Sequence, residues 1–456
     1  MSEVLLSALW FVLAVGVLIT VHEFGHFWVA RRVGVKVLRF SIGFGRPLLS
    51  WRSAPDQPEY VVAALPLGGY VKMLDETEGD VPPQEVHRAF NRQRLAGRVA
   101  IVVAGPAFNF LFAILAYWVM FMVGVTGVRP VVGGVTEGSI AAQAGLRAGD
   151  EILEVAGERT ATWETAILEL LPKVMDGKPV ELEIQDPGGG TRRTTLDLST
   201  RSVEIEGSKL LPELGIRPWR PDIPPIIGRI VSGGPAEAAG LQAGDRMLSA
   251  DGTPIGDWNE WVEYVRSHPG RAISAKVERA GHTITLRITP EAVADDAGGV
   301  MGRIGAAVAL TDASAHEAPT ATLRYNPLRA LVEGVGKTWQ MTTLTLHLLY
   351  KMVVGQASWQ NISGPISIAQ YAGQAASIGV ATFLAFLGLV SVSLGVLNLL
   401  PVPVLDGGHL LYYGIEAVKG SPVSEQGQLF GQRIGMALLL ALMALAFYND
   451  LARLFY

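Results

Sequence analysis

No cysteine occurs in this sequence of 456 residues. Disulfide bonds, thiolate metal ligands and a cysteine nucleophile are therefore all excluded. Charged residues make up only 17% of the chain, and at a net charge of −5 the basic ones are scattered along it. A nucleic-acid partner is accordingly not expected. Because 49% of the residues are hydrophobic, the composition favours membrane spans joined to soluble modules over an ordinary soluble protein.

Long apolar runs predict a multi-pass α-helical membrane protein with four transmembrane helices. A helical crossing needs about 20 apolar residues. The run at residues 4–21 carries no charge, whereas the run at residues 352–405 is too long for one crossing and should begin with a surface or re-entrant piece. The predicted transmembrane helices are residues 1–31, 98–126, 375–406 and 427–450.

Basic residues near the ends of the spans predict the orientation of the chain. Four of them follow the first span and four precede the second: Arg31, Arg32, Lys36 and Arg39, then Arg88, Arg92, Arg94 and Arg98. Loops rich in lysine and arginine face the cytoplasm. We therefore expect loops 32–97 and 407–426 to be cytoplasmic. Both termini and the region between the second and third spans should lie outside.

The first cytoplasmic loop contains a candidate β segment. Residues 59–72 read EYVVAALPLGGYVK, which is rich in β-formers up to Leu65 and then carries the pair Gly68 and Gly69. This pattern predicts a hairpin or an irregular sheet. Its apolar character favours a small membrane-associated β segment that dips toward the bilayer.

The outer region contains an internal repeat. The heptapeptide AGLRAGD at residues 144–150 returns as AGLQAGD at residues 239–245, and each copy continues into short alternating strands. Trp163 and Trp258 are separated by the same interval. The pattern predicts two inserted α+β domains, residues 127–220 and 221–312, joined by a proline-rich linker at residues 217–225.

Each predicted domain resembles a PDZ module, in which a peptide is captured by adding a strand to a sheet edge. Two interpretations remain open: the modules bind periplasmic peptides, or they only fill space and restrict access. After them, residues 313–374 should form an outer-face amphipathic segment, because residues 325–352 mix Trp339 and leucines with lysine and arginine in a pattern that suits a helix lying on the membrane.

The segment HEFGH ends the first predicted span. His22 and His26 are four residues apart, so on a helix both imidazoles project from one face and can bind one metal ion. Glu23 would stand beside a metal-bound water and take its proton. Ionisable groups inside an apolar helix are costly, about 2.5 to 3.5 kcal/mol each, and tend to mark function. The alternative is a pair of interfacial histidines that bind only their neighbours.

A third protein ligand is expected, since a catalytic zinc site has three protein ligands and one open position. The segment NLLPVPVLDGGH at residues 398–409 breaks the third span at a matching depth and offers Asp406. Pro401 and Pro403 forbid regular helix, and two glycines after the aspartate permit a tight turn. His409 could compete for the metal, but the two histidines and the aspartate already complete a set.

HEFGH in a first span together with NLLPVPVLDGG in a later one resembles the site-2 protease family of intramembrane zinc metalloproteases. The order of spans and tandem PDZ modules is similar too, as are three short motifs: SIGFG at 41–45, PLGGYVKMLDE at 66–76 and AGPAFNF at 104–110. The resemblance implies that His22, His26 and Asp406 bind Zn²⁺. It also implies that Glu23 is the general base.

The resemblance further implies substrate-binding residues in two segments: Asn398, Pro401 and Pro403 near the metal, and Gly68, Gly69 and Tyr70 in the β segment, which pairs with an unwound substrate strand. Ser393 departs from the family, in which asparagine is frequent at that position, so no contact is assigned to it. Implied substrates are single-pass transmembrane proteins, such as anti-sigma factors already trimmed outside, and signal-peptide remnants, cleaved near the cytosolic face in an envelope stress response.

The expected location is the bacterial inner membrane, among its lipids, with the PDZ-like domains periplasmic and the active site near the cytoplasmic face. An alternative from another class is a membrane-anchored scaffold whose PDZ pair holds peptides while the metal is structural. A metal transporter fits less well, because only one metal site is evident and the spans carry no further row of carboxylates or histidines.

Overall fold

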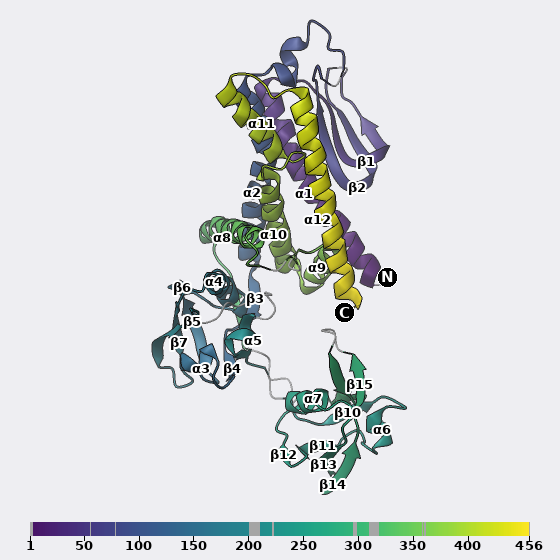
Figure 1. Cartoon of the computed structure of the whole chain (residues 1–456), viewed down its shortest axis with the longest axis vertical. Coiled ribbons are helices and arrows are strands. Elements are labelled where there is room, and N and C mark those ends of the chain that lie inside the picture. The colour runs from purple at the N-terminus through teal and green to yellow at the C-terminus, as the bar shows by residue number, and fades with distance from the viewer. Residues whose placement is uncertain are drawn as a thin grey trace. The chain divides into compact units, whose positions relative to one another are not determined.

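Figure 1 shows a computed structural model of the chain. It describes residues 3–54, 56–77, 79–199, 210–220, 223–294, 299–309, 319–357, 359 and 362–455. The chain divides into two compact units. The first contains Met1–Thr126 and Thr322–Asp450, and the second is built from the residues between these two stretches. The predicted boundary near residue 312 lies outside the described residues.

The first unit is mainly helical. Its helices are α1 (Glu3–Val33), α2 (Leu95–Val123), α8 (Pro327–Val353), α9 (Pro365–Ile378), α10 (Val380–Leu399), α11 (Asp406–Lys419) and α12 (Glu425–Phe455), with two 3-10 turns, η1 (Val86–Arg88) and η2 (Phe90–Arg92), before α2. Within the described ranges, α1, α2, α10 and α12 are long and apolar enough to cross a membrane. The prediction of four spans is confirmed.

Glycines set two of the span boundaries differently from the prediction. Helix α2 ends before Gly124, whose φ of 103° stops the helix, so the predicted end at residue 126 is wrong. Helix α10 begins after Gly379, which has a φ of 145°. The predicted start of the third span at residue 375 is therefore wrong, because that residue belongs to the separate helix α9. The other two spanning helices extend a few residues beyond their predicted ends.

Helix α2 is the centre of the helical unit, because it packs against α1, α8, α10 and α11. Its buried residues include Ile101, Ala113, Ala116 and Tyr117, which are at most 3% exposed. The many alanines and glycines on this helix let its neighbours approach closely, as is usual where helices pack within a membrane. Helix α2 therefore fixes the positions of α1, α10 and α11 relative to one another.

The β segment is larger than predicted. Strands β1 (Val37–Trp51) and β2 (Glu59–Met73) have 15 residues each and pair antiparallel with several register shifts. Ser41 pairs with both Val61 and Tyr70, so each strand is bent and contributes two segments to the sheet. The four segments lie side by side in the order 47–51, 60–63, 39–42 and 69–73. Of the two predicted forms, the irregular sheet is the one found (Figure 1). The predicted segment corresponds to β2, and its partner strand β1 was not predicted.

The second unit contains two modules with the same sheet order. The first has β4 (Val132–Val135), α3 (Ile140–Gln143), β5 (Glu151–Val155), β6 (Glu158–Arg159), α4 (Trp163–Met175), β7 (Val180–Gln185), β8 (Thr191–Leu196), α5 (Leu210–Leu214) and β9 (Ile216–Pro218). Its sheets are β6-β5-β7-β8 and β4-β9. Since β9 reaches Pro218, the predicted linker begins too early at residue 217.

The second module has β10 (Ile227–Ile230), α6 (Pro235–Ala238), β11 (Arg246–Ala250), β12 (Thr253–Pro254), α7 (Trp258–Arg266), β13 (Ile273–Arg279), β14 (His282–Ile288), β15 (Glu291–Ala294), β16 (Val300–Arg303) and β17 (Ala306–Val308). Its sheets β12-β11-β13-β14 and β10-β17 repeat the first module, and β15-β16 is an addition. The predicted duplication is confirmed. Strands β3 (Val125–Val128) and β18 (Thr320–Leu323) pair where the chain leaves and re-enters the first unit.

The aspartate of each AGLxAGD repeat is buried and ion-paired. Asp150 accepts a hydrogen bond from Arg192 at 2.8 Å, and Asp245 accepts one from Arg279 at 2.6 Å. Each carboxylate also accepts a backbone N–H three residues earlier in the chain. Asp245 is fully buried. The repeated aspartate therefore joins its loop to the neighbouring hairpin in both modules.

We predict that Asp245→Asn destabilises the second module by roughly 3 kcal/mol, because it leaves the Arg279 guanidinium without its charged partner. Burial raises the pKa of the Asp245 carboxyl, but Arg279 and the Gln242 N–H outweigh this and lower it. The pair therefore stabilises the module fully above the unfolded pKa of about 3.9, and less as the pH falls through the lower folded value. Hydrogen exchange on the full-length protein measures this.

Asp150→Asn is the matched control, since it should increase exchange in the first module and leave the second unchanged. Equal exchange in the second module of wild type and Asp245→Asn would contradict the prediction.

Candidate active site

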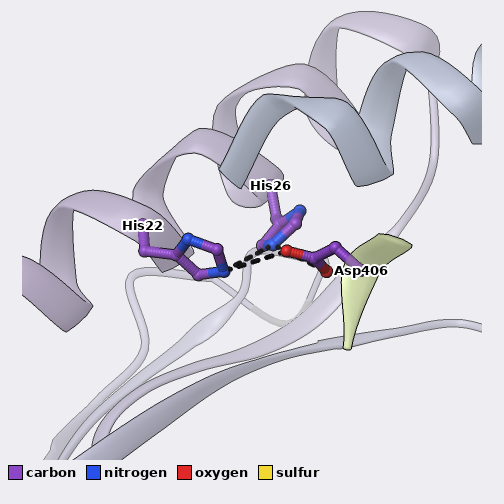
Figure 2. A group of neighbouring side chains, drawn as sticks. All are labelled: His22, His26 and Asp406. Atoms are coloured by element: carbon purple, nitrogen blue, oxygen red, sulfur yellow. Dashed lines mark hydrogen bonds and ion pairs between the residues drawn. The ribbon is translucent and has the colours of Figure 1, made fainter. Parts of the chain in front are cut away.

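The two histidines of HEFGH lie together on α1, as their spacing predicts. The Nε2 atoms of His22 and His26 are 3.2 Å apart. Asp406, the first residue of α11, approaches both: its Oδ2 lies 3.2 Å from His22 Nε2, and its Oδ1 lies 3.5 Å from His26 Nε2 (Figure 2). Two segments at opposite ends of the sequence thus meet at one point.

The three side chains fit one zinc ion. Their ligand atoms all lie within 4.8 Å of one another. Zinc bonds to nitrogen and oxygen of about 2.0 to 2.2 Å in a tetrahedron place the ligand atoms roughly 3.3 Å apart. The two Nε2 atoms are 3.2 Å apart, and His22 Nε2 lies 3.2 Å from Asp406 Oδ2. Asp406 Oδ2 is buried and accepts no hydrogen bond from the described residues. A largely buried carboxylate whose two oxygens each face an imidazole nitrogen calls for a cation between the three side chains.

Helix α2 supports the histidines from behind. A Cβ on Gly105 would collide with His26 Nε2, and a Cβ on Gly25 would collide with the Ala104 carbonyl oxygen, so only glycine allows α1 and its imidazoles to lie this close. The carbonyl oxygen of Ile101 lies 2.8 Å from His26 Nδ1. Since a carbonyl can only accept, Nδ1 carries the proton and Nε2 is left free for a metal. No role for these α2 residues was predicted.

The loop before Asp406 is held in an unusual conformation. Val404 has a φ of 101°, a region that a β-branched residue rarely enters. A Cβ on Gly407 would collide with the Leu400 carbonyl, and a Cβ on Gly435 of α12 would collide with the Pro403 carbonyl. The loop is thus tightly packed between α11, which follows it, and α12. As predicted, glycine after Asp406 is needed for the close turn, although here it forms the first turn of a helix.

An ion pair anchors α11 to α2. Arg98 donates to Glu416 at 3.1 Å, and both side chains are about 15% exposed. The Arg98 guanidinium also lies 5.0 Å from the centre of the Tyr413 ring. Burial raises the pKa of the Tyr413 phenol to about 12, so the ring stays neutral beside the cation. Because α2 thus holds α11 as well as both histidines, it aligns all three candidate ligands.

Glu23 faces the edge of the β sheet. A Cβ on Gly69 would lie 2.8 Å from the Ser41 carbonyl oxygen and 3.2 Å from Glu23 Cγ, so a larger residue would push the strand away from α1. The predicted β segment therefore reaches the predicted general base.

The remaining predicted residues surround this arrangement without joining the ligand set. Gly68 lies against the ring of Phe44, which stacks on Tyr70 with ring centres 6.2 Å apart. Pro401 and Pro403 form the loop before Asp406. Asn398 is half-buried in the last turn of α10. His409 lies in the first turns of α11 and is outside the group of candidate ligand atoms.

The fold and the site define a membrane-bound metallopeptidase, and comparison with known families agrees. The sequence pattern of peptidase family M50 matches residues 10–442. The chain therefore belongs to this family, and it is a zinc metalloprotease with several membrane spans. The alternative of a non-enzymatic scaffold is set aside.

Individual relatives cover essentially the whole chain. It is 46% identical to "Regulator of sigma E protease" of Salmonella typhi over 99% of this chain and 100% of that protein. It is equally similar, over the same shares, to "Regulator of sigma-E protease RseP" of Escherichia coli strain K12. A Vibrio cholerae relative that is 43% identical over the full length of both chains has the words "zinc metalloprotease" in its name. Together with the four candidate spans, these relatives support a multi-pass protein of the inner membrane.

Proposed function

We propose that this protein is an intramembrane endopeptidase in which His22, His26 and Asp406 bind the zinc ion and Glu23 is the general base. The observation that carries the proposal is the convergence of three ligand atoms from the two ends of the chain beside a fourth, acidic residue. When bound, zinc supplies Lewis acidity that activates water toward a peptide carbonyl. Glu23 accepts the proton of that water and passes it to the leaving amide nitrogen.

A peptide bond must leave its helix before it can be cleaved, because a helical carbonyl is hydrogen-bonded and shielded. The sheet segment at residues 69–73 pairs with β1 on one side and, among the described residues, with no strand on its other side. This segment approaches Glu23 at Gly69, where a Cβ would lie 3.2 Å from Glu23 Cγ. An extended substrate strand that adds to this edge regains its lost backbone hydrogen bonds and lies beside the general base. Gly68, Gly69 and Tyr70 belong to this substrate platform.

Gly69→Val is expected to lower kcat/KM by about 100-fold, the loss expected when reacting groups are displaced by about 1 Å. The added side chain would strike the Ser41 carbonyl and Glu23, and so move the strand edge from the general base. Zinc content should stay at the wild-type level. Gly336→Val in α8 is the control, because this glycine is exposed and a Cβ there meets nothing within 4 Å. Full activity of Gly69→Val would contradict the assignment of the platform.

The substrates proposed are the transmembrane segments of single-pass proteins. Relatives of the chain are named as regulators of sigma-E, which favours an anti-sigma factor as one substrate and a role in an envelope stress response. Signal-peptide remnants have the same form, an apolar helix with little outside the membrane. Asn398, Pro401 and Pro403, on the loop that leads to Asp406, would contact the segment near the metal.

The orientation proposed places the active site near the cytoplasmic face and the two modules in the periplasm. It rests on the basic residues that flank α1 and α2. The modules are proposed to be PDZ-like domains that exclude substrates with a large outer domain. Helix α8 exposes Leu328, Val332 and Trp339 and would lie on the outer lipid surface.

The test is cleavage in liposomes. Purified protein is reconstituted with a single-pass substrate whose outer domain is either intact or removed, and the products are identified by mass spectrometry. We expect a cut inside the apolar segment near its cytosolic end, and only in the trimmed form. A cut confined to residues outside the membrane would contradict the intramembrane assignment. Equal cleavage of both forms would contradict the proposed exclusion of untrimmed substrates by the modules, but not the intramembrane cleavage.

A further inference from the structure

One buried polar side chain beside the metal ligands has no partner for half of its amide. Asn109 lies in the middle of α2 and is fully buried. Its Nδ2 is placed 3.0 Å from His22 Nδ1, and its Oδ1 has no hydrogen-bond partner among the described residues. An amide left half-satisfied in an apolar environment is costly, so this arrangement calls for an explanation.

The chemistry of His22 decides which way the amide must point. His22 Nε2 faces Asp406 and His26, so it is the nitrogen that binds a metal. A neutral imidazole that binds through Nε2 carries its proton on Nδ1. That N–H needs an acceptor, whereas the amide NH₂ group is a donor. The nitrogen and oxygen of an amide have almost the same shape, so a half-turn of the group places Oδ1 where the acceptor is needed.

We propose that Asn109 is a positioning residue that accepts the His22 Nδ1–H through its Oδ1 and so presents Nε2 to the zinc ion. The rotated amide gives the imidazole proton its acceptor and leaves Nδ2, in place of Oδ1, without a partner among the described residues. The proton on His22 Nδ1 therefore decides between the two orientations. The role of Asn109 matches that of the Ile101 carbonyl, which lies 2.8 Å from His26 Nδ1. Each of the two histidine ligands is then oriented by its own acceptor, and both acceptors come from α2.

Helix α10 fixes the position of Asn109. Ser391 donates its hydroxyl to the Asn109 backbone carbonyl at 2.8 Å, and Ser391 is fully buried. A Cβ on Gly395 would lie 3.4 Å from the Asn109 Cβ, so the two helices are in close contact here. The amide can therefore rotate about its own axis, but the residue cannot move away from His22.

The test compares substitutions that keep or remove the acceptor in full-length protein, with the zinc dissociation constant measured by chelator competition. Asn109→Asp keeps an acceptor and loses the donor, so it should hold zinc within about threefold of wild type or more tightly. Asn109→Leu removes the acceptor and should weaken zinc binding by about 10- to 100-fold. Asn109→Ala should do the same without adding bulk. Asn449→Leu, which removes a buried asparagine from α12, is the control and should change zinc affinity by less than about twofold.

Each outcome is decisive. If Asn109→Asp loses as much affinity as Asn109→Leu, the amide donates to His22 and the proposal is wrong. If Asn109→Leu and Asn109→Ala both bind zinc like wild type, the contact has no positioning role. The inference rests on the proposed role of His22 as a ligand, so His22→Ala is measured in parallel. Undiminished zinc in His22→Ala would refute that ligand assignment, a result separate from either outcome at Asn109.

Discussion

Replacing Glu23 with glutamine is expected to abolish peptide-bond cleavage while zinc stays bound. The amide keeps the size of the side chain but cannot accept the proton of the attacking water. General-base catalysis contributes roughly 10²- to 10⁴-fold to the rate, and we expect a loss of kcat in the upper half of that range. Glu23 is not among the three candidate ligands, so zinc content should remain one ion per chain. Cleavage of a trimmed single-pass substrate and elemental analysis measure the two effects.

Glu137→Gln provides the matched control, since this glutamate is exposed in the first module and should tolerate the change with full activity. The prediction fails if Glu23→Gln cleaves at more than about a tenth of the wild-type rate. Loss of zinc together with activity would show instead that Glu23 supports the metal site and that another residue is the base.

Asp406→Ala should remove zinc from the purified protein. Two imidazoles alone do not complete a catalytic zinc site, which needs three protein ligands. The loss of affinity should exceed the roughly 10- to 100-fold expected for a residue that only supports a ligand. Activity should fall with the metal content. Elemental analysis and chelator competition measure the zinc, and cleavage of the trimmed substrate measures the activity.

His409→Ala separates this prediction from its main competitor. His409 lies three residues after Asp406 but outside the group of candidate ligand atoms, so this variant should keep its zinc. The assignment of Asp406 is refuted if Asp406→Ala retains stoichiometric zinc while His409→Ala loses it.

The parts of the site that depend on local geometry could be predicted from the sequence. His22 and His26 share a helix face because four residues make about one turn, and Asp406 stood out as a carboxylate at the end of an apolar run. Gly105, Ile101 and Asn109 could not be predicted in this way. Their roles depend on how closely α1 and α2 pack, and nothing in the local pattern of α2 reports which side faces the histidines.

The same distinction applies to the fold. The repeated heptapeptide revealed two copies of one module, but not why its aspartate recurs. Arg192 lies 42 residues after Asp150, whereas Arg279 lies 34 residues after Asp245, so no fixed interval connects the pairs. Strand β1 was missed because glycines at positions 43 and 45, both with positive φ, interrupt the alternation that identifies a strand.

Strands β3 and β18 pair at the point where the two modules are inserted into the helical unit. The hydroxyl groups of Thr126 and Thr322 lie 2.9 Å apart at this junction, so the polypeptide departs from the helical unit and returns to it at nearly the same place. All three candidate metal ligands belong to the helical unit. The inserted modules can therefore be lengthened, shortened or exchanged without altering the path of the chain through the helical unit, so they can evolve separately from the residues that would bind zinc.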